Sequence, residues 1–295
     1  MSYSHGDQLR GGSLALISAI CLSATFIASK YVLQHLSVLA FAPLWFGAAT
    51  IWSLLILSLT RNLSGMTLLS SHMKPLFWVG VTSCVGTYVF FLAIEIGDAT
   101  LVSFLSRSET IFSVLLGVFL MHERLSVRQW AGFVLAVTGA GVMTYRGGDV
   151  IIQVVVLVLV ANFFLALTSY IAKKTISNVP ATIIALYRTM FMTVVFFMSG
   201  LLTNELTIPA WPIMQWILVG ALLGPSLSFI LYYRSLKYID LGHSAVIRSI
   251  QPLFVALGSF LLLNTIISVQ QATGGIIIIL GIMLLVWRKK NDRPV

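Results

Sequence analysis

The chain of 295 residues is 58% hydrophobic and only 9% charged, with a formal net charge of +9 at pH 7. Soluble domains are about half apolar and about a quarter charged, so this composition excludes an ordinary soluble protein and indicates an integral membrane protein. We expect the positive charge to lie in loops at the membrane surface and predict no nucleic-acid partner. Cys21 and Cys84 fall in apolar segments, where we expect neither a disulfide nor a metal site.

Ten apolar segments follow one another along the chain, each close to the length of about 20 residues that crosses a bilayer. They cover residues 13–33, 38–60, 75–95, 98–121, 126–145, 149–172, 180–203, 211–235, 240–263 and 267–288. Their connections are too short to hold a soluble domain. We therefore predict an all-α integral membrane fold of ten transmembrane helices.

The charged residues of the loops predict the orientation of these helices. If the N-terminus is cytoplasmic, the cytoplasmic loops and tails hold Arg10, Arg61, Lys74, Arg124, Arg128, Lys173, Lys174, Lys237, Arg288, Lys289, Lys290 and Arg293. The opposite loops hold only Arg146 among basic residues, together with Glu95, Asp98, Asp149 and Glu205. Positive charge in short loops marks the cytoplasmic side, so we expect a multi-pass protein of the inner (plasma) membrane with both termini in the cytoplasm.

The second half of the chain repeats the first at an offset of 142 residues. Identities at this offset include Asp98/Asp240, Ser126/Ser268, Val127/Val269, Gln129/Gln271, Gly132/Gly274, Gly139/Gly281 and Arg146/Arg288. We predict two five-helix repeats, residues 1–146 and 147–295. Because five is an odd number, the second repeat must be inverted relative to the first, as in many secondary transporters with a midplane site. A duplicated structural bundle without a transport role is the alternative.

Several of the repeated residues have a local structural meaning. Asp98 and Asp240 are expected N-caps of the fourth and ninth spans. Ser126 and Ser268 each precede a glutamine by three residues, a capping-box pattern that predicts the starts of the fifth and tenth spans. The paired glycines lie seven residues apart on one helix face, where they would let a neighbouring helix approach closely.

Five basic residues fall inside the predicted spans. Lys30 and Arg234 lie near span ends, where we expect their side chains to reach water. Arg107, Arg188 and Arg248 lie about 12–13 Å from the nearest span end at 1.5 Å per residue. A charge at that depth costs several kcal/mol unless it faces a partner or a wet cavity. We therefore predict that these three arginines point into the protein.

The fourth span combines Arg107 with Glu109. Residues two apart lie on different faces of a helix, so this pair cannot form its own ion pair. Ser103 and Thr110 extend the same broad polar face. The other buried arginines, Arg188 and Arg248, are the expected cation partners of Glu109.

The ninth span carries Ser244, Arg248 and Gln251 in one narrow stripe. Pro252 removes a backbone N–H, which should kink this helix and free the carbonyl of Arg248 for a ligand. Thr110 stands at the position of Pro252 in the first repeat, so we expect the fourth span to be straighter.

Two further prolines predict irregular helices. Pro43 and Pro225 should break the second and eighth spans. Tyr88 and Tyr232, near equivalent ends of the third and eighth spans, are candidate walls of a substrate site, with an interfacial aromatic belt as the alternative.

Two long segments carry a family resemblance. "SETIFSVLLGVFLMHERLSVRQWAGFVLAVTGAGVM" (108–143) and "IQPLFVALGSFLLLNTIISVQQATGGIIIILGIMLL" (250–285) are similar to the EamA family of the drug/metabolite transporter superfamily. The resemblance implies ten spans in two repeats and a central cavity lined mainly by spans 1–4 and 6–9. It also implies that spans 5 and 10 are peripheral and that export is the commoner direction.

These observations predict a secondary active transporter, an exporter, of a small polar anionic or zwitterionic metabolite such as an amino acid or organic acid. The candidate substrate-binding residues are Arg107, Arg248, Ser103, Thr110, Gln251, Ser244, Arg188, Tyr88 and Tyr232. Glu109 is the candidate carrier of a coupling proton, with a structural ion pair as the other interpretation.

A flippase for a lipid-linked anionic headgroup would use the same charges and is the alternative function. We expect no enzyme, because paired acids within a span, metal-spaced histidines, a nucleotide loop and a Ser–His–Asp grouping are not found in the sequence. No cofactor is expected beyond possible proton coupling. The expected partners are a small-molecule substrate and the lipid bilayer, and the protein should be a monomer or a homodimer.

Overall fold

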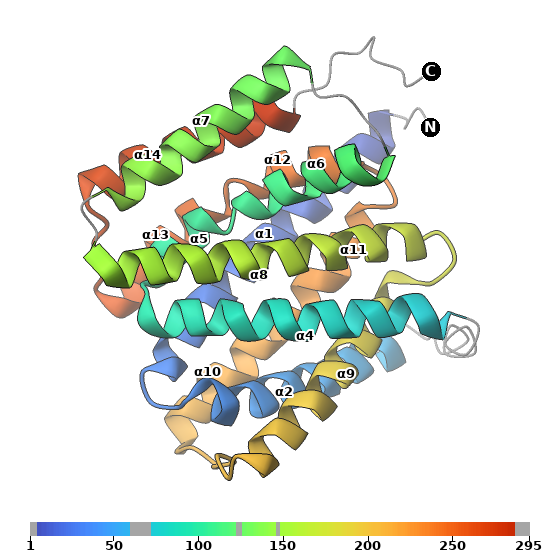
Figure 1. The fold of residues 1–295 in the computed structure, drawn as a ribbon. Coiled ribbons are helices and arrows are strands. Elements are labelled where there is room, and N and C mark those ends of the chain that lie inside the picture. Colours follow the sequence, from blue (N-terminus) through green and yellow to red (C-terminus); the bar gives the residue numbers. More distant parts are fainter. Residues whose placement is uncertain (1–4, 60–71, 122–125, 146–147, 287–295) are drawn as a thin grey trace.

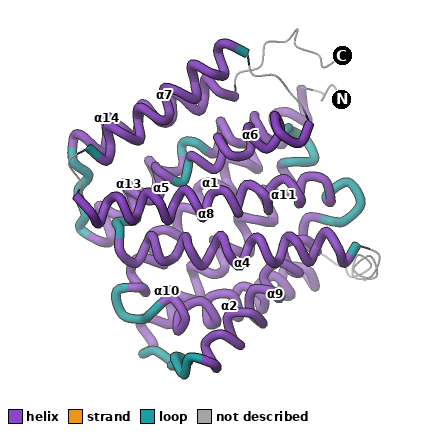
Figure 2. Tube along the Cα trace, in the orientation of Figure 1, coloured by secondary structure: helices purple, strands orange, loops and turns teal. Residues whose placement is uncertain are grey.

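The computed structural model describes residues 5–59, 72–121, 126–145 and 148–286, and every regular element within them is a helix (Figure 2). The first half comprises α1 (His5–Leu33), α2 (Val38–Leu59), α4 (Met73–Ile96), α5 (Ala99–Leu105), α6 (Ser108–Met121) and α7 (Val127–Thr144). The second half comprises α8 (Gly148–Thr175), α9 (Ala181–Leu202), α10 (Trp211–Ala221), η2 (Leu222–Ser228), α11 (Phe229–Ser235), α12 (Leu241–Arg248), α13 (Gln251–Leu263) and α14 (Val269–Val286).

These helices confirm the predicted fold of ten spans in two inverted five-helix repeats. Eight helical stretches in the described residues are long and apolar enough to cross a membrane, and α14 is a shorter apolar helix. The helices run side by side across the molecule, and α1 begins on the side where α14 ends (Figure 1). We call this the terminal side of the bundle and the opposite side the distal side.

The fourth and ninth spans are both interrupted near their middle. The fourth breaks between α5 and α6 at Ser106 and Arg107, and the ninth breaks between α12 and α13 at Ser249 and Ile250. The expectation of a straighter fourth span was therefore wrong. A tight turn makes the break without proline, because the Arg107 N–H bonds to the carbonyl of Phe104, three residues back, at 3.0 Å.

The two other prolines behave differently from each other. Pro225 lies in η2, a π-helical segment, so the predicted interruption of the eighth span is confirmed. Pro43 lies inside α2, which is continuous from Val38 to Leu59, so the predicted break of the second span was wrong. Pro43 is little more than one turn from the start of its helix, where only a short stretch precedes the backbone bond that it removes.

The predicted helix starts are confirmed at both pairs of equivalent positions. The carboxylate of Asp98 accepts a hydrogen bond from the Leu101 N–H at 2.7 Å. Asp240 accepts from the His243 N–H at 2.8 Å and also bonds to the ring of that histidine. The reciprocal capping-box bonds form at Ser126 with Gln129, and at Ser268 with Gln271.

The last helices of the two halves, α7 and α14, lie together at one edge of the bundle (Figure 1). A Cβ atom at Gly139 would lie 2.7 Å from the backbone nitrogen of Ile278. A Cβ atom at Gly281 would lie 2.4 Å from the backbone nitrogen of Ala136. The glycines therefore permit direct backbone contact, as predicted, and the two helices are peripheral, as the resemblance implies.

Two lysines bind helix ends at equivalent positions of the repeats. The Lys30 ammonium group donates to the carbonyls of Ile94 at 3.0 Å, Glu95 at 3.0 Å and Gly97 at 2.6 Å. We expected this side chain to reach water, but the last carbonyls of a helix lack partners within the helix and attract a cation. Lys30 is partly buried in this contact.

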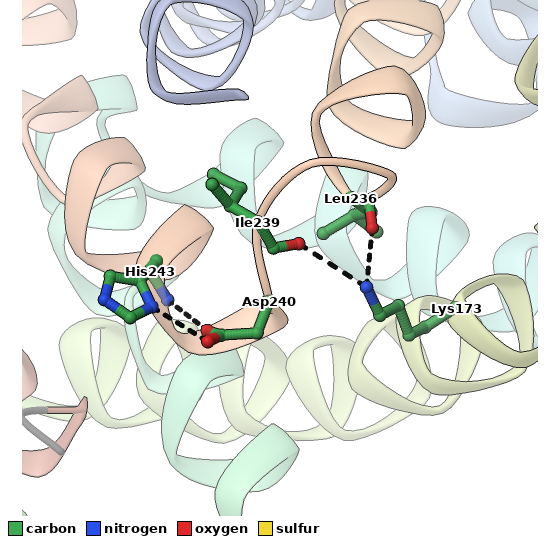
Figure 3. A network of polar contacts seen from close by, with 5 residues as sticks. All are labelled: Lys173, Leu236, Ile239, Asp240 and His243. Atoms are coloured by element: carbon green, nitrogen blue, oxygen red, sulfur yellow. Dashed lines mark hydrogen bonds and ion pairs between the residues drawn. The ribbon is translucent and has the colours of Figure 1, made fainter. Parts of the chain in front are cut away.

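Lys173 makes the corresponding contact in the second half (Figure 3). Its ammonium group donates to the carbonyls of Leu236 at 2.6 Å and Ile239 at 3.4 Å. These carbonyls lie 142 residues after those of Ile94 and Gly97, which is the offset of the sequence repeat. One contact is on the distal side and its equivalent is on the terminal side.

Replacing Gly139 by Ala should destabilise the protein by about 1–3 kcal/mol, since the new methyl group would meet backbone atoms that cannot move independently. Gly141→Ala on the same helix is the matched control, because a Cβ there meets nothing within 4 Å. Thermal unfolding in detergent should show a lower midpoint for the first variant and no loss for the second. Equal midpoints would contradict the close packing.

Replacing Lys173 by Met should cost about 1–3 kcal/mol, because it removes charge-assisted hydrogen bonds to helix-end carbonyls. Lys174→Met is the control, since that exposed ammonium group lies over the Tyr170 ring at 4.6 Å. Unfolding midpoints of both variants in the same detergent measure the difference. If Lys174→Met lowers the unfolding midpoint as much as Lys173→Met, the carbonyl contacts of Lys173 do not contribute the expected extra stability.

Candidate functional site

A cavity lies in the middle of the bundle and encloses about 740 Å³ of space free of protein atoms, its opening included. Its lining comes from spans 1–4 and 6–9, the set that the family resemblance implies. The lining residues are Leu22, Thr25, Phe26, Trp45, Phe46, Thr87, Phe90, Phe91, Ser106, Arg107, Glu109, Asn162, Leu165, Thr168, Ser169, Arg188, Pro225, Phe229, Tyr232 and Arg248.

Five of the ten candidate residues line this cavity: Arg107, Arg188, Arg248, Tyr232 and Glu109. The structure thus brings together every charged side chain that the sequence placed deep in the spans. The three arginine side chains are nearly inaccessible to solvent, as predicted.

The other five candidates lie outside the lining. Ser103 and Ser244 are fully buried, and the Ser103 hydroxyl donates to the carbonyl of Thr100 at 2.7 Å. Tyr88 lies beside Phe196, with ring centroids 6.5 Å apart. Thr110 is partly exposed on α6. The fifth, Gln251, is fully buried next to the cavity and holds one of the arginines.

Arg107 joins the breaks of the two interrupted spans. Its Nη1 donates to the carbonyl of Arg248 at 2.9 Å, and its Nη2 donates to Oε1 of Gln251 at 2.9 Å. The Arg248 carbonyl is the acceptor that Pro252 frees by lacking an N–H. We expected a ligand to use this carbonyl, but the protein's own guanidinium group occupies it.

Arg188 and Arg248 are held mainly against aromatic rings of α11. The Arg188 guanidinium lies 3.9 Å from the centroid of Phe229, and its Nε donates to Oγ of Ser83 at 2.9 Å. The Arg248 guanidinium lies 4.1 Å from the centroid of Tyr232. A cation over a ring face is attracted by the ring quadrupole, which fixes both groups in orientation without neutralising them.

Each guanidinium group keeps a buried nitrogen without a hydrogen-bond partner among the described residues. These atoms are Nε of Arg107, Nη1 of Arg188 and Nε of Arg248. Buried donors are normally satisfied, so unpaired ones in a cavity indicate a place for a ligand or water.

Glu109 is the single carboxylate of the lining, and its Oε1 accepts from the Ser169 hydroxyl at 3.0 Å. In the described part of the chain, no ion pair joins Glu109 to any of the three arginines. The predicted pairing with Arg188 or Arg248 is therefore wrong for this conformation. Glu109 is partly exposed, so water can solvate the carboxylate in place of a cation.

Polar residues of α8 were missed by the sequence analysis. Asn162 is fully buried and donates to Oγ of Ser108 at 2.8 Å, while Thr168 and Ser169 also line the cavity. Three polar residues in a very apolar span were a usable signal, but we followed only the charges. Nearby, the Thr82 and Thr168 hydroxyls share a 2.7 Å hydrogen bond between α4 and α8.

Aromatic side chains of α1, α2 and α4 form the apolar part of the wall. Phe26 meets Phe90 edge-on at a centroid distance of 5.1 Å. Trp45 meets Phe91 edge-on at 6.3 Å, and both are fully buried. Such edge-to-face pairs are rigid, so this part of the wall has a fixed shape.

The two interrupted spans are packed unequally on the two sides of the cavity. On α13, which runs to the distal side, Gln251, Pro252 and Val255 are buried. The equivalent residues of α6, which runs to the terminal side, are Glu109, Thr110 and Ser113, and all are partly exposed. At these three positions the distal half-helix is therefore buried where its terminal equivalent is partly exposed.

Membrane helices in two inverted repeats around a charged midspan cavity are an architecture of membrane transporters. The model of the EamA-like transporter family matches residues 9–145 and 152–287. The chain belongs to this family.

Two relatives of this chain are described as a transporter and an efflux pump. An uncharacterized transporter of Methanothermobacter thermautotrophicus is 26% identical over 211 residues, covering 66% of this chain and 59% of its own length. A probable amino-acid metabolite efflux pump of Salmonella typhimurium is 28% identical over 176 residues, covering 58% of this chain and 56% of its own length. The matched regions thus span less than two thirds of either relative.

One protein of known crystal structure has the same fold. It superposes with a TM-score of 0.71 over 92% of this chain and 95% of its own, at 16% identity. At 16% identity this structural similarity supports the fold and no conclusion about function.

Proposed function

We propose that this protein is a secondary active transporter that exports a small polar anionic or zwitterionic metabolite, such as an amino acid or organic acid. The observation that carries the proposal is the set of three buried guanidinium groups, each with an unpartnered nitrogen, in one midspan cavity. A planar guanidinium fork suits a carboxylate or phosphate. Charges at this depth are costly and are kept where they serve a substrate pathway.

Alternating access around the cavity would move the substrate. The buried stripe on α13 and the partly exposed equivalent stripe on α6 support a conformation closed on the distal side. With inverted repeats, an exchange of the two packing arrangements would close the terminal side instead. We propose that the protein lies in the inner membrane with its terminal side facing the cytoplasm, because the basic loops lie on that side.

The residues have distinct proposed roles. Arg248 and Arg188 bind the acidic group of the substrate, and Tyr232 orients Arg248. Arg107 and Gln251 hold the breaks of the fourth and ninth spans together and do not contact the substrate directly. The description of the Salmonella relative as an efflux pump supports export of a metabolite.

Glu109 is proposed as the proton-coupling residue. Among the described residues it is the one acid of the cavity lining, and it is partly exposed. We propose no resident cofactor and no enzymatic activity. A monomer or homodimer would be functional, because both halves of the cavity come from one chain.

Arg248→Ala should reduce transport at least about 30-fold while the protein remains folded, because a desolvated charge pair lost from a site costs about 2–5 kcal/mol. A thermal-shift screen against amino acids, organic acids and phosphorylated metabolites would first find a binder. Uptake of that binder into proteoliposomes then compares the variant with the parent protein. Arg234→Ala, an exposed arginine on α11, is the control, and unchanged uptake in Arg248→Ala would remove Arg248 from the site.

Glu109→Gln should leave substrate exchange intact but stop accumulation driven by a pH gradient, since an amide cannot carry the proton. Exchange and pH-driven uptake are measured on the same proteoliposomes. Ser113→Ala, one helical turn further along the same face of α6, is the control. Accumulation that persists in Glu109→Gln would make Glu109 structural.

A further inference from the structure

One helix positions two of the three cavity arginines. Phe229 and Tyr232 are three residues apart on α11 and therefore lie on the same helix face. Their ring centroids are 6.5 Å apart. The Arg188 guanidinium lies over the first ring and the Arg248 guanidinium over the second, although they come from α9 and α12. One pair of adjacent rings thus supports two cations that come from different helices.

The rings hold these cations without supplying any negative charge. In the described part of the chain, the other hydrogen-bond partner of Arg188 is the neutral hydroxyl of Ser83, and those of Arg107 are a carbonyl and an amide. Among the described residues, the lining contains three guanidinium groups and one carboxylate, which leaves an excess of two positive charges. In a membrane interior that excess is unfavourable until counter-charges arrive.

We infer that the substrate of this site is a small organic dianion. Its two negative charges bind Arg188 and Arg248, which lie over the rings of Phe229 and Tyr232. This inference rests on the proposed transport function and narrows its substrate class. A dianion would neutralise the excess charge of the lining and satisfy Nη1 of Arg188 and Nε of Arg248. A zwitterion would leave the excess unchanged.

The aromatic part of the cavity wall, on α1, α2 and α4, constrains the body of the ligand. Phe26, Phe90, Trp45 and Phe91 present rigid apolar surface with few polar atoms. A ligand body that is apolar or aromatic would fit there, while its acidic groups face α11. The expected ligand therefore has both charges at one end.

The test compares three compounds built on one skeleton. Phenylsuccinate carries two carboxylates, 3-phenylpropionate carries one, and phenylalanine carries one carboxylate and one ammonium group. Binding to the purified full-length protein is measured by calorimetry and thermal shift at about pH 7.5, where the carboxylates are ionised. Phenylsuccinate should bind at least about tenfold more tightly than 3-phenylpropionate, which should bind at least as tightly as phenylalanine.

Variants locate the selectivity. Arg188→Gln and Arg248→Gln should each weaken phenylsuccinate binding at least about tenfold and bring it close to 3-phenylpropionate, because one arginine still holds one carboxylate. Phe229→Leu keeps all the charges but removes the ring beneath Arg188, so it should reduce the preference even if an arginine variant fails to fold. Arg234→Gln, exposed on the same helix, is the control and should retain the preference.

The outcomes separate this inference from the transport function. Equal binding of the three compounds, tighter binding of phenylalanine, or no binding by any of them overturns the dianion preference. So does a tenfold preference that survives in both arginine variants and in Phe229→Leu. Proteoliposome uptake of the binder found in the thermal-shift screen tests the transport function independently, because that assay assumes no particular charge.

Discussion

A guanidinium group in the centre of an apolar bundle must find its polar partners within the protein, and Arg107 shows how this constraint shapes the fold. Its two hydrogen bonds reach a carbonyl freed by Pro252 and the amide of Gln251, both at the break of the ninth span. The residue itself lies at the break of the fourth span. The two interruptions are therefore tied to each other, and the irregular backbone is tolerated because it faces protein and cavity instead of lipid.

The three arginines therefore have different roles. Arg107 joins the two halves, whereas Arg188 and Arg248 are supported mainly by aromatic rings and keep buried nitrogens without a described hydrogen-bond partner. Aromatic rings orient a cation but leave its charge in place, whereas a carboxylate would cancel it. The described lining thus keeps more positive than negative charge, a condition that suits a site for an acidic ligand.

Local patterns in the sequence predicted much of the fold. The ten spans, the caps at Asp98 and Asp240, and the glycine faces of α7 and α14 all depend on residues close together in the chain or on a simple repeat. The break at Arg107 was not predicted, because it needs no proline and is fixed by partners 141 and 144 residues away. The caps made by Lys30 and Lys173 were not predicted for the same reason, since their roles depend on which spans become neighbours. Asn162 was overlooked although a polar residue in a very apolar span is visible in the sequence.

The paired lysine caps have a consequence for membrane insertion. Lys30 closes a helix end on the distal side, and Lys173 closes the equivalent end on the terminal side, with acceptors in matching places. The same internal bonds thus stabilise a five-helix unit whichever way up it lies in the lipid. These bonds therefore do not determine the orientation of the unit in the membrane, which the lysines and arginines of the loops determine instead.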